Sequence, residues 1–278
     1  MTGELDKRRH PYRGDIAAEE LRGRVDAERF VAAREYHVGA ALADLCRHPR
    51  ADSPLDTQML LGECFRVYDI AGEWAWGQAV LDGYVGYVRT RDLREGFRTP
   101  THLVRALRTF FYRDADLKSP VLMSTGMNAK LSVEKTEGSF SRTDEGYVFT
   151  KHLAGADTRI DDYVSVAERL LGVPYLWGGR DSLGLDCSAL LQLSLEWSGI
   201  ACPRDTDMQE RELGVEAEGF TRGDFVFWRG HVGIMQNETQ FLHAEANSMS
   251  VTSEPIEQAI RRIRKIEGEI RCIRRLPR

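Results

Sequence analysis

The amino-acid sequence predicts an α+β protein in which two small β-barrels precede a domain built of helices and antiparallel strands. Short pieces of alternating polar and apolar residues, separated by glycines, fill residues 36–155. Two of these pieces share the ending G-Y-V-x-T-x-x-L, as GYVRTRDL at 86–93 and GYVFTKHL at 146–153, which indicates a duplicated unit. From residue 156 the pattern changes to two helical stretches and then four strand candidates, which is typical of an α+β layer.

The first 35 residues are expected to form a helical arm. Ile16, Leu21, Val25 and Phe30 recur at roughly helical intervals over residues 16–33. Residues 36–98 follow as the first barrel, with the strand candidates CFRVYDI, EWAWGQAVL and GYVGYVRT. Residues 99–155 are expected to form the second barrel.

The last domain is expected to span residues 156–278. Residues 158–171 place apolar side chains on one helical face, and Gly172 with Pro174 ends that helix. A glycine-rich loop, PYLWGGRDSLGLD, leads into a second helix, CSALLQLSLEWSG. Four strand candidates follow, which are DFVFW, HVGIMQ, QFLHAEA and SMSVTSE.

Composition excludes several classes of protein. The chain has 278 residues, 42% of them hydrophobic and 29% charged, and its net charge of −5 argues against nucleic acid as a partner. A basic run near residues 261–278 is interpreted as a solvated helix face and an edge strand, with a phosphate-binding surface as the alternative. The sequence has no long apolar stretch and no signal-peptide pattern. We therefore expect a cytoplasmic location without membrane association.

The five cysteines are scattered and form no C-x-x-C pair, which argues against a disulfide framework and a structural zinc site. The sequence also lacks both G-x-x-x-x-G-K-[ST] and G-x-G-x-x-G, so no metal, nucleotide or other cofactor is expected.

Cys187 differs from the other cysteines because it follows the glycine-rich loop at the first turn of a predicted helix. Unpaired N–H groups and the positive end of the helix dipole stabilise an anion there, so we expect a lowered pKa for this thiol. The same N–H groups can stabilise the oxyanion formed when the sulfur attacks a carbonyl group. The position therefore suits a nucleophile.

Two histidines, His231 and His243, share the domain of Cys187. They lie twelve positions apart on strand candidates joined by the short loop NET. Because strand faces alternate with period two, a hairpin would place both rings on one face. A general base and its orienting partner require this arrangement, although a lone histidine or cysteine is more often structural.

Three segments, PYLWGGRDSLGLDCSALLQ, RGDFVFWRGHVGIM and FLHA, resemble the NlpC-type family of papain-like cysteine peptidases, which cleave peptidoglycan stem peptides. The resemblance covers about residues 156–275. It implies a papain-like fold with Cys187 as nucleophile, His231 as general base and His243 as the residue that orients it. Tyr175 matches the family tyrosine that helps to bind the oxyanion. Ala189 departs from the glycine that many members carry after the serine.

The upstream barrels are similar to bacterial SH3-like domains, and the whole arrangement resembles the intracellular members that trim free murein peptides. Those members cut between γ-D-glutamate and the diamino acid and require a free N-terminal L-alanine. LLGE at 60–63 and DGYVGY at 82–87 match the elements that bind the ammonium group, so the resemblance implies this role for Glu63 and Tyr84. A solvated strand end for Glu63 and barrel packing for Tyr84 are the alternatives.

The resemblance also implies substrate contacts for Asp186 and Ser188, which flank the nucleophile, and for Thr206, where a small hydroxyl residue is common. Trp74, Trp76 and Trp177 are candidates for lining the cleft, with packing in the core as the alternative.

These residues predict a cytoplasmic cysteine endopeptidase that acts on L-alanyl-γ-D-glutamyl-diamino acid peptides, the murein stem peptides, during wall recycling. Two other functions fit the same residues. An amidase or acyltransferase would use the same cysteine and histidine on another acyl group. A binding protein would hold a wall fragment on its barrels with an inert third domain.

Overall fold

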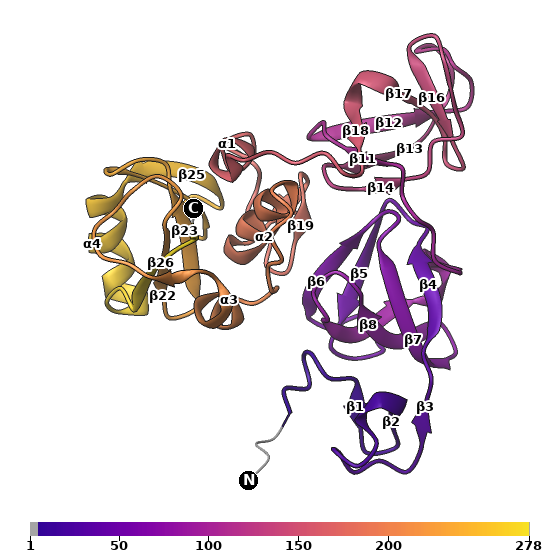
Figure 1. Ribbon diagram of the computed structural model, residues 1–278, viewed down its shortest axis with the longest axis horizontal. Coiled ribbons are helices and arrows are strands. Elements are labelled where there is room, and N and C mark those ends of the chain that lie inside the picture. Colours follow the sequence, from indigo (N-terminus) through magenta and orange to yellow (C-terminus); the bar gives the residue numbers. More distant parts are fainter. Residues whose placement is uncertain (1–4, 278) are drawn as a thin grey trace. The chain divides into compact units, whose positions relative to one another are not determined.

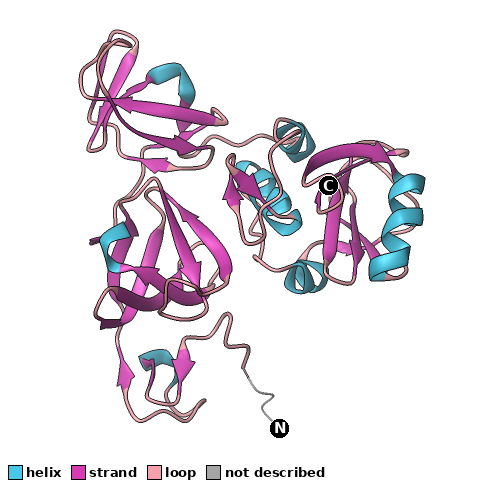
Figure 2. Ribbon diagram, turned by 180° about the vertical axis from the view of Figure 1, so that it is seen from behind, coloured by secondary structure: helices cyan, strands magenta, loops and turns pink. Residues whose placement is uncertain are grey.

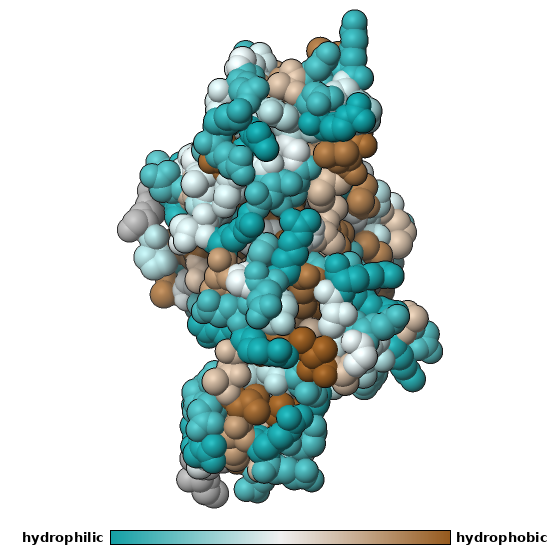
Figure 3. Space-filling view, turned by 90° about the vertical axis from the view of Figure 1, so that its right-hand side faces the viewer, coloured by the Kyte–Doolittle hydropathy of each residue, from teal (hydrophilic) through white to brown (hydrophobic). Residues whose placement is uncertain are grey.

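The computed structural model describes residues 5–277 and divides into two compact units, residues 1–156 and residues 157–278 (Figure 1). Strands dominate the first unit, whereas the second combines helices with a sheet (Figure 2). The face shown in Figure 3 is mostly hydrophilic, with hydrophobic side chains in small groups. Within the described residues, every helix is too short or too polar to cross a bilayer.

The N-terminal residues do not form the predicted helix. The segment instead contains β1 (Tyr12–Arg13), β2 (Ile16–Ala18), the 3₁₀ turn η1 (Glu19–Leu21) and β3 (Phe30–Val31). The helical arm over residues 16–33 was therefore wrong. Ile16, Ala18 and Leu21 are buried against Tyr68 and Trp76 of the following sheet. Tertiary packing against these aromatic rings outweighs a helical spacing that was only loose.

The first β-rich segment forms one sheet of seven strands in the order β10-β4-β7-β8-β9-β5-β6. Its strands are β4 (Arg34–Val38), β5 (Leu42–Cys46), β6 (Leu55–Leu60), β7 (Cys64–Ala71), β8 (Trp74–Ala79), β9 (Val85–Arg89) and β10 (Leu93–Glu95). A 3₁₀ turn, η2 (Thr90–Asp92), joins the last two strands. Alternate side chains such as Leu45, Phe65 and Val88 are buried and form its core.

The second β-rich segment has two small sheets, β14-β11-β18 and β13-β12-β17-β16-β15. Its elements are β11 (His102–Val104), β12 (Arg108–Tyr112), β13 (Val121–Gly126), β14 (Lys130–Leu131), β15 (Lys135–Glu137), β16 (Phe140–Thr143), β17 (Gly146–Phe149), η3 (Thr150–His152) and β18 (Leu153–Gly155). Leu61 of the preceding segment is buried in the same core as Phe111 and Val148. The boundary between two barrels at residues 98 and 99 stays a prediction.

The repeated sequence ending has a repeated local structure. GYVRTRDL runs through the end of β9, the turn η2 and the start of β10. GYVFTKHL runs through β17, η3 and the start of β18 in the same order of strand, 3₁₀ turn and strand. The two matching sequences thus fold alike.

The second unit has a six-stranded antiparallel sheet in the order β21-β26-β22-β23-β24-β25, with helix α4 on one side and α1 and α2 on the other (Figure 1). Its elements are α1 (Tyr163–Glu168), β19 (Arg180–Asp181), β20 (Gly184–Leu185), α2 (Cys187–Trp197), α3 (Thr206–Glu212), β21 (Val215–Glu216), β22 (Phe225–Trp228), β23 (His231–Met235), β24 (Gln240–Glu245), β25 (Ser250–Pro255), α4 (Ile256–Glu267) and β26 (Cys272–Arg275).

The four strand candidates of this unit correspond to β22, β23, β24 and β25, and the second predicted helix corresponds to α2. The first helix is shorter than residues 158–171, because the Asp162 side chain accepts the Val164 N–H and starts the helix at Tyr163. Helix α3 was not predicted. Buried strands between helices on both sides of a sheet agree with the predicted α+β, papain-like fold.

Candidate active site

Cys187 is the first residue of α2, as predicted. The side chain of Asp186 caps the helix by accepting the Ala189 N–H at 2.9 Å. The loop before it needs glycine, because a methyl group at Gly179 would lie 2.5 Å from the carbonyl oxygen of Gly184. The sequence therefore delivers the thiol to the helix end where unpaired N–H groups are available.

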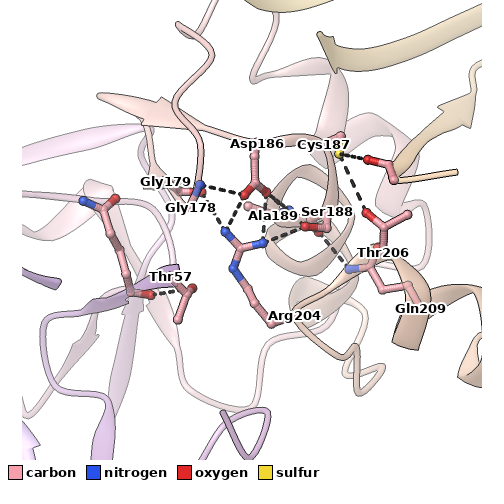
Figure 4. Close-up of polar contacts among 12 residues, drawn as sticks. Thr57, Gly178, Gly179, Asp186, Cys187, Ser188, Ala189, Arg204, Thr206 and Gln209 are labelled. Atoms are coloured by element: carbon pink, nitrogen blue, oxygen red, sulfur yellow. Dashed lines mark hydrogen bonds and ion pairs between the residues drawn. The ribbon is translucent and has the colours of Figure 1, made fainter. Parts of the chain in front are cut away.

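The Cys187 sulfur lies beside the beginning of β23. It is 4.0 Å from the carbonyl oxygen of Gly230, and the backbone of Val232 also hydrogen-bonds it. Thr206, at the start of α3, places its Oγ1 atom 3.8 Å from the sulfur (Figure 4). The structure thus brings Cys187 next to the backbone on both sides of His231 and next to the predicted Thr206.

The predicted lowering of the Cys187 pKa was wrong. The residue is only 6% exposed, and burial raises the pKa of its thiol to about 11. The Asp186 carboxylate adds to this increase, whereas Thr206, the Val232 backbone and Arg204 act in the opposite direction. At neutral pH the resting sulfur is therefore a neutral thiol, because the loss of hydration outweighs the stabilising contacts.

The two predicted histidines meet on one face of the sheet. Nε2 of His231 lies 2.8 Å from Nδ1 of His243, which confirms the even-spacing argument. The strand register extends to pair His243 with Gly233, two residues beyond His231 on the same face. A methyl group at Gly233 would lie 2.7 Å from the His243 Cβ and 2.4 Å from Phe241 Cζ, so only glycine leaves room for the ring.

His231 is held neutral by its surroundings. Burial lowers its pKa well below 6.5, and the neighbouring His243 and Arg262 lower it further. With Nε2 turned to His243, the Nδ1 atom is the ring nitrogen of His231 that can act as a base. The Cys187 thiol and the His231 imidazole are therefore both neutral at rest.

Tyr175 lies close to the nucleophile. Its N–H donates to the carbonyl oxygen of Met249 at 2.8 Å, which fixes the backbone beside β25. Burial raises the pKa of its hydroxyl above the ordinary range, and Cys187 is the second cause of that increase. The phenol is therefore protonated and within electrostatic reach of the sulfur, as an oxyanion donor must be.

The side chains of Asp186 and Ser188 are engaged inside the protein, and their contact with substrate stays a prediction. Arg204, 1% exposed, donates to both carboxylate oxygens of Asp186 at 2.9 and 2.7 Å and to the Ser188 hydroxyl at 2.6 Å (Figure 4). Gly178 N–H occupies the same carboxylate at 2.9 Å. These side chains hold the start of α2 in place.

Glu63 and Tyr84 do not form an open ammonium site in the first unit. Glu63 is 2% exposed, accepts the Leu60 N–H at 3.0 Å and pairs with Lys130 Nζ at 3.2 Å. Tyr84 is 4% exposed and belongs to the core of the seven-stranded sheet with Leu45. Both side chains are thus packed within this unit, and their role at an ammonium site stays a prediction. Of the three aromatic candidates, Trp76 is core and Trp177 is exposed.

Sequence reasoning missed Glu254, which lies next to the histidine pair. Its Oε1 atom is 2.9 Å from Nε2 of His243. Glu254 is the last residue of the strand candidate SMSVTSE, and the pairing of His243 with Thr252 places it on the face of His243. Even spacing could not have identified it, because His243 and Glu254 lie eleven positions apart; the strand register of this second hairpin is what brings them together.

Comparisons with known proteins agree with this geometry. Residues 172–266 match the NlpC/P60 family, and residues 45–93 match the bacterial dipeptidyl-peptidase SH3 domain. Two relatives named γ-D-glutamyl-L-lysine dipeptidyl-peptidase are each 24% identical. The one from Bacillus cereus aligns over 73% of this chain and 71% of its own length. The one from Bacillus subtilis aligns over 81% and 82%.

The fold is also found in a solved structure. A crystal structure of an NlpC/P60 family protein from Bacillus cereus covers 87% of this chain with a TM-score of 0.73 and 20% identity, and all of that protein is matched. The matched SH3 domain lies in the first unit and the matched peptidase domain in the second. The chain thus carries a bacterial SH3 domain and, after it in sequence, a cysteine peptidase domain of the NlpC/P60 family.

Proposed function

We propose that the chain hydrolyses the bond between γ-D-glutamate and the diamino acid in murein peptides that begin with a free L-alanine. The observation that carries this proposal is the arrangement of Cys187, at the first turn of α2, beside His231 and its partner His243. The names of the two curated relatives support the choice of bond.

The first half-reaction forms a thioester. Nδ1 of His231 takes the Cys187 proton while the sulfur attacks the γ-glutamyl carbonyl carbon, since both groups begin neutral. Backbone N–H groups at the start of α2 and the protonated Tyr175 hydroxyl stabilise the resulting oxyanion. The imidazolium of His231 then gives its proton to the departing amine of the diamino acid.

The second half-reaction restores the enzyme. Neutral His231 removes a proton from water, which attacks the thioester carbonyl and releases the dipeptide carboxylate. His231 returns that proton to the Cys187 sulfur. Each turnover consumes one water molecule and needs no cofactor.

The requirement for a free amino terminus is part of this proposal. A dipeptidyl-peptidase removes two residues from an amino terminus, so the relatives' names support this requirement. Glu63 and Tyr84, which the resemblance assigns to the ammonium group, are both buried within the first unit. We also propose a cytoplasmic role in recycling, because only peptides released from the wall present this free terminus.

The test uses the full chain with L-Ala-γ-D-Glu-L-Lys, the corresponding diaminopimelate peptide, and the N-acetylated form of each. We expect L-Ala-D-Glu and free diamino acid from the first two, and no product from the acetylated peptides. Cys187→Ala should abolish turnover. Cys272→Ala, which removes a half-buried thiol from β26 in the same unit, is the matched control and should retain it.

Two outcomes contradict the proposal. If reduced wild-type protein leaves all four peptides intact, the chosen bond is wrong. If the acetylated peptides are cleaved as fast as the free ones, the chain does not read the amino terminus, and an amidase or broader endopeptidase describes it better.

A further inference from the structure

Three strands and one helix contribute charged or ring groups to a single hydrogen-bonded series. His231 on β23 contacts His243 on β24 at 2.8 Å, and His243 contacts Glu254 on β25 at 2.9 Å. Arg262 on α4 pairs with Glu254 and, at 3.0 Å, with Glu245 at the end of β24. Among the described residues, the charged or titratable groups in contact with His243 or Glu254 are thus His231 and Arg262, with Glu245 on the far side of Arg262.

Because these groups are buried, their hydrogen bonds within the protein determine which ring nitrogen of each histidine carries the proton. His243 has no exposed surface, and the Glu254 side chain is 18% exposed. A buried imidazole must satisfy both ring nitrogens, and in the neutral ring one nitrogen donates while the other accepts. Whichever group contacts Nε2 of His243 therefore decides what its Nδ1 atom can do.

A carboxylate can only accept a hydrogen bond. Contact with His243, and to a smaller extent with Arg262, lowers the pKa of Glu254, so the group is ionised at neutral pH. Nε2 of His243 must then carry the proton and donate it to Glu254, which leaves Nδ1 as an acceptor. Nδ1 in turn accepts from Nε2–H of His231, and the remaining lone pair of His231 is on Nδ1.

We propose that Glu254 is a positioning residue that sets the tautomers of both histidines, and that Arg262 holds it in place for this purpose. This inference rests on the proposed function, in which His231 Nδ1 takes the thiol proton. Without an acceptor at residue 254, His243 can adopt the opposite tautomer and donate from Nδ1 to His231. The His231 proton then moves to Nδ1, where it blocks the base.

The variants separate the acceptor from its charge. Glu254→Leu removes both, and we expect kcat to fall about 100-fold with KM within about twofold, as for the loss of a correctly placed general base. Glu254→Gln keeps an oxygen that can accept from His243, so kcat should fall less than about 10-fold.

Glu245→Gln is the matched control. It removes one negative charge, as Glu254→Gln does, and it also removes an ion pair with Arg262. The side-chain partners of His243 in the described residues are His231 and Glu254, so this variant leaves the hydrogen bonds of His243 intact. Its kcat should remain within about twofold of wild type. Equal losses in Glu245→Gln and Glu254→Leu would show that the ion pair to α4, rather than the tautomer, matters, and would overturn the inference.

A second measurement does not depend on peptidase activity. In full-length protein labelled with ¹⁵N-histidine, we expect His231 and His243 to carry their protons on Nε2, and His243 to change tautomer in Glu254→Leu. Protonated Nδ1 on wild-type His243 would refute the inference even if Glu254→Leu fails to fold. If the wild-type protein cleaves none of the peptides, the proposed function is rejected. The NMR assignment of the tautomers would still test the role of Glu254.

Discussion

At the scale of single residues, the notable feature is the protonation of the Cys187 and His231 pair. Burial raises the pKa of the thiol to about 11 and lowers that of the imidazole well below 6.5. The two groups therefore do not exist as a thiolate and an imidazolium before substrate arrives. Proton transfer from sulfur to nitrogen is part of the attack itself, which is general-base catalysis rather than attack by a preformed anion.

This state predicts how the free enzyme reacts with iodoacetamide. Only the thiolate is alkylated, and a raised pKa places the thiolate in the alkaline range. The labelling rate of Cys187 should therefore be slow at pH 7 and rise with pH toward about 11. Mass spectrometry of the peptide that contains Cys187 separates it from the other four cysteines. A rate that reaches its plateau below pH 8 would mean that the resting pair is ionic.

At the scale of secondary-structure elements, the hairpin of β23 and β24 depends on one position without a side chain. Gly233 lies opposite His243 in the extended register, and its missing methyl group makes room for that ring. The backbone of Gly233 does not have a positive φ angle, so its conformation is open to other residues. Glycine is needed here because a larger residue would collide with its neighbours.

Gly233→Ala should consequently displace His243 from His231. We expect kcat/KM on the dipeptide substrate to fall about 100-fold, the effect of misplacing a catalytic group by about 1 Å. Gly14→Ala is the control, since a methyl group there meets nothing within 4 Å. Wild-type kinetics in Gly233→Ala would show that the ring has more space than the structure provides.

The start of α2 depends on a buried ion pair, Asp186 with Arg204. Arg204→Met leaves the carboxylate buried without its partner, so we expect a loss of about 3–5 kcal/mol in the free energy of unfolding. The double variant Asp186→Asn with Arg204→Met should recover much of that loss. Urea unfolding followed by tryptophan fluorescence measures both.

A surface pair in the same unit provides the comparison. Arg222 is 41% exposed in its pair with Asp162, and Arg222→Met should cost less than about 1 kcal/mol. Equal costs for Arg204→Met and Arg222→Met would contradict the structural role given to the buried pair.

At the scale of the whole molecule, features that depend on neighbouring residues could be predicted from the sequence, whereas features that depend on contacts between remote segments could not. Strands β22 to β25 follow from local alternation, and the contact of His231 with His243 follows from even spacing within one hairpin. The Cys187 pKa could not be predicted, because it depends on burial beneath segments remote in sequence. Glu254 was missed for a similar reason, since its role requires the pairing of a third strand.

The first unit shows the same limit for binding residues. Matching short motifs placed Glu63 and Tyr84 at an ammonium site, but packing within the unit buries both side chains. The bond from Lys130 to Glu63 connects the segment after β6 to β14 instead. Glu63 is therefore a structural residue of this unit.

Glu63→Gln should lower stability without changing substrate affinity. Loss of the buried charge partner of Lys130 is expected to cost about 1–3 kcal/mol in the unfolding of the first unit. KM for the free-amine peptide should stay within about twofold of wild type in both Glu63→Gln and Tyr84→Phe. A large increase of KM at unchanged stability would restore the ammonium role.

The order of strands in the second unit has a consequence for synthesis on the ribosome. Strand β26 (Cys272–Arg275) is inserted between β21 and β22, both of which are made earlier. Until it emerges, those two strands present unpaired edges that invite association with other nascent chains. Completion of the hydrolytic unit therefore waits for its most distal strand, so a ribosome stalled before residue 272 would carry an unfinished and aggregation-prone sheet.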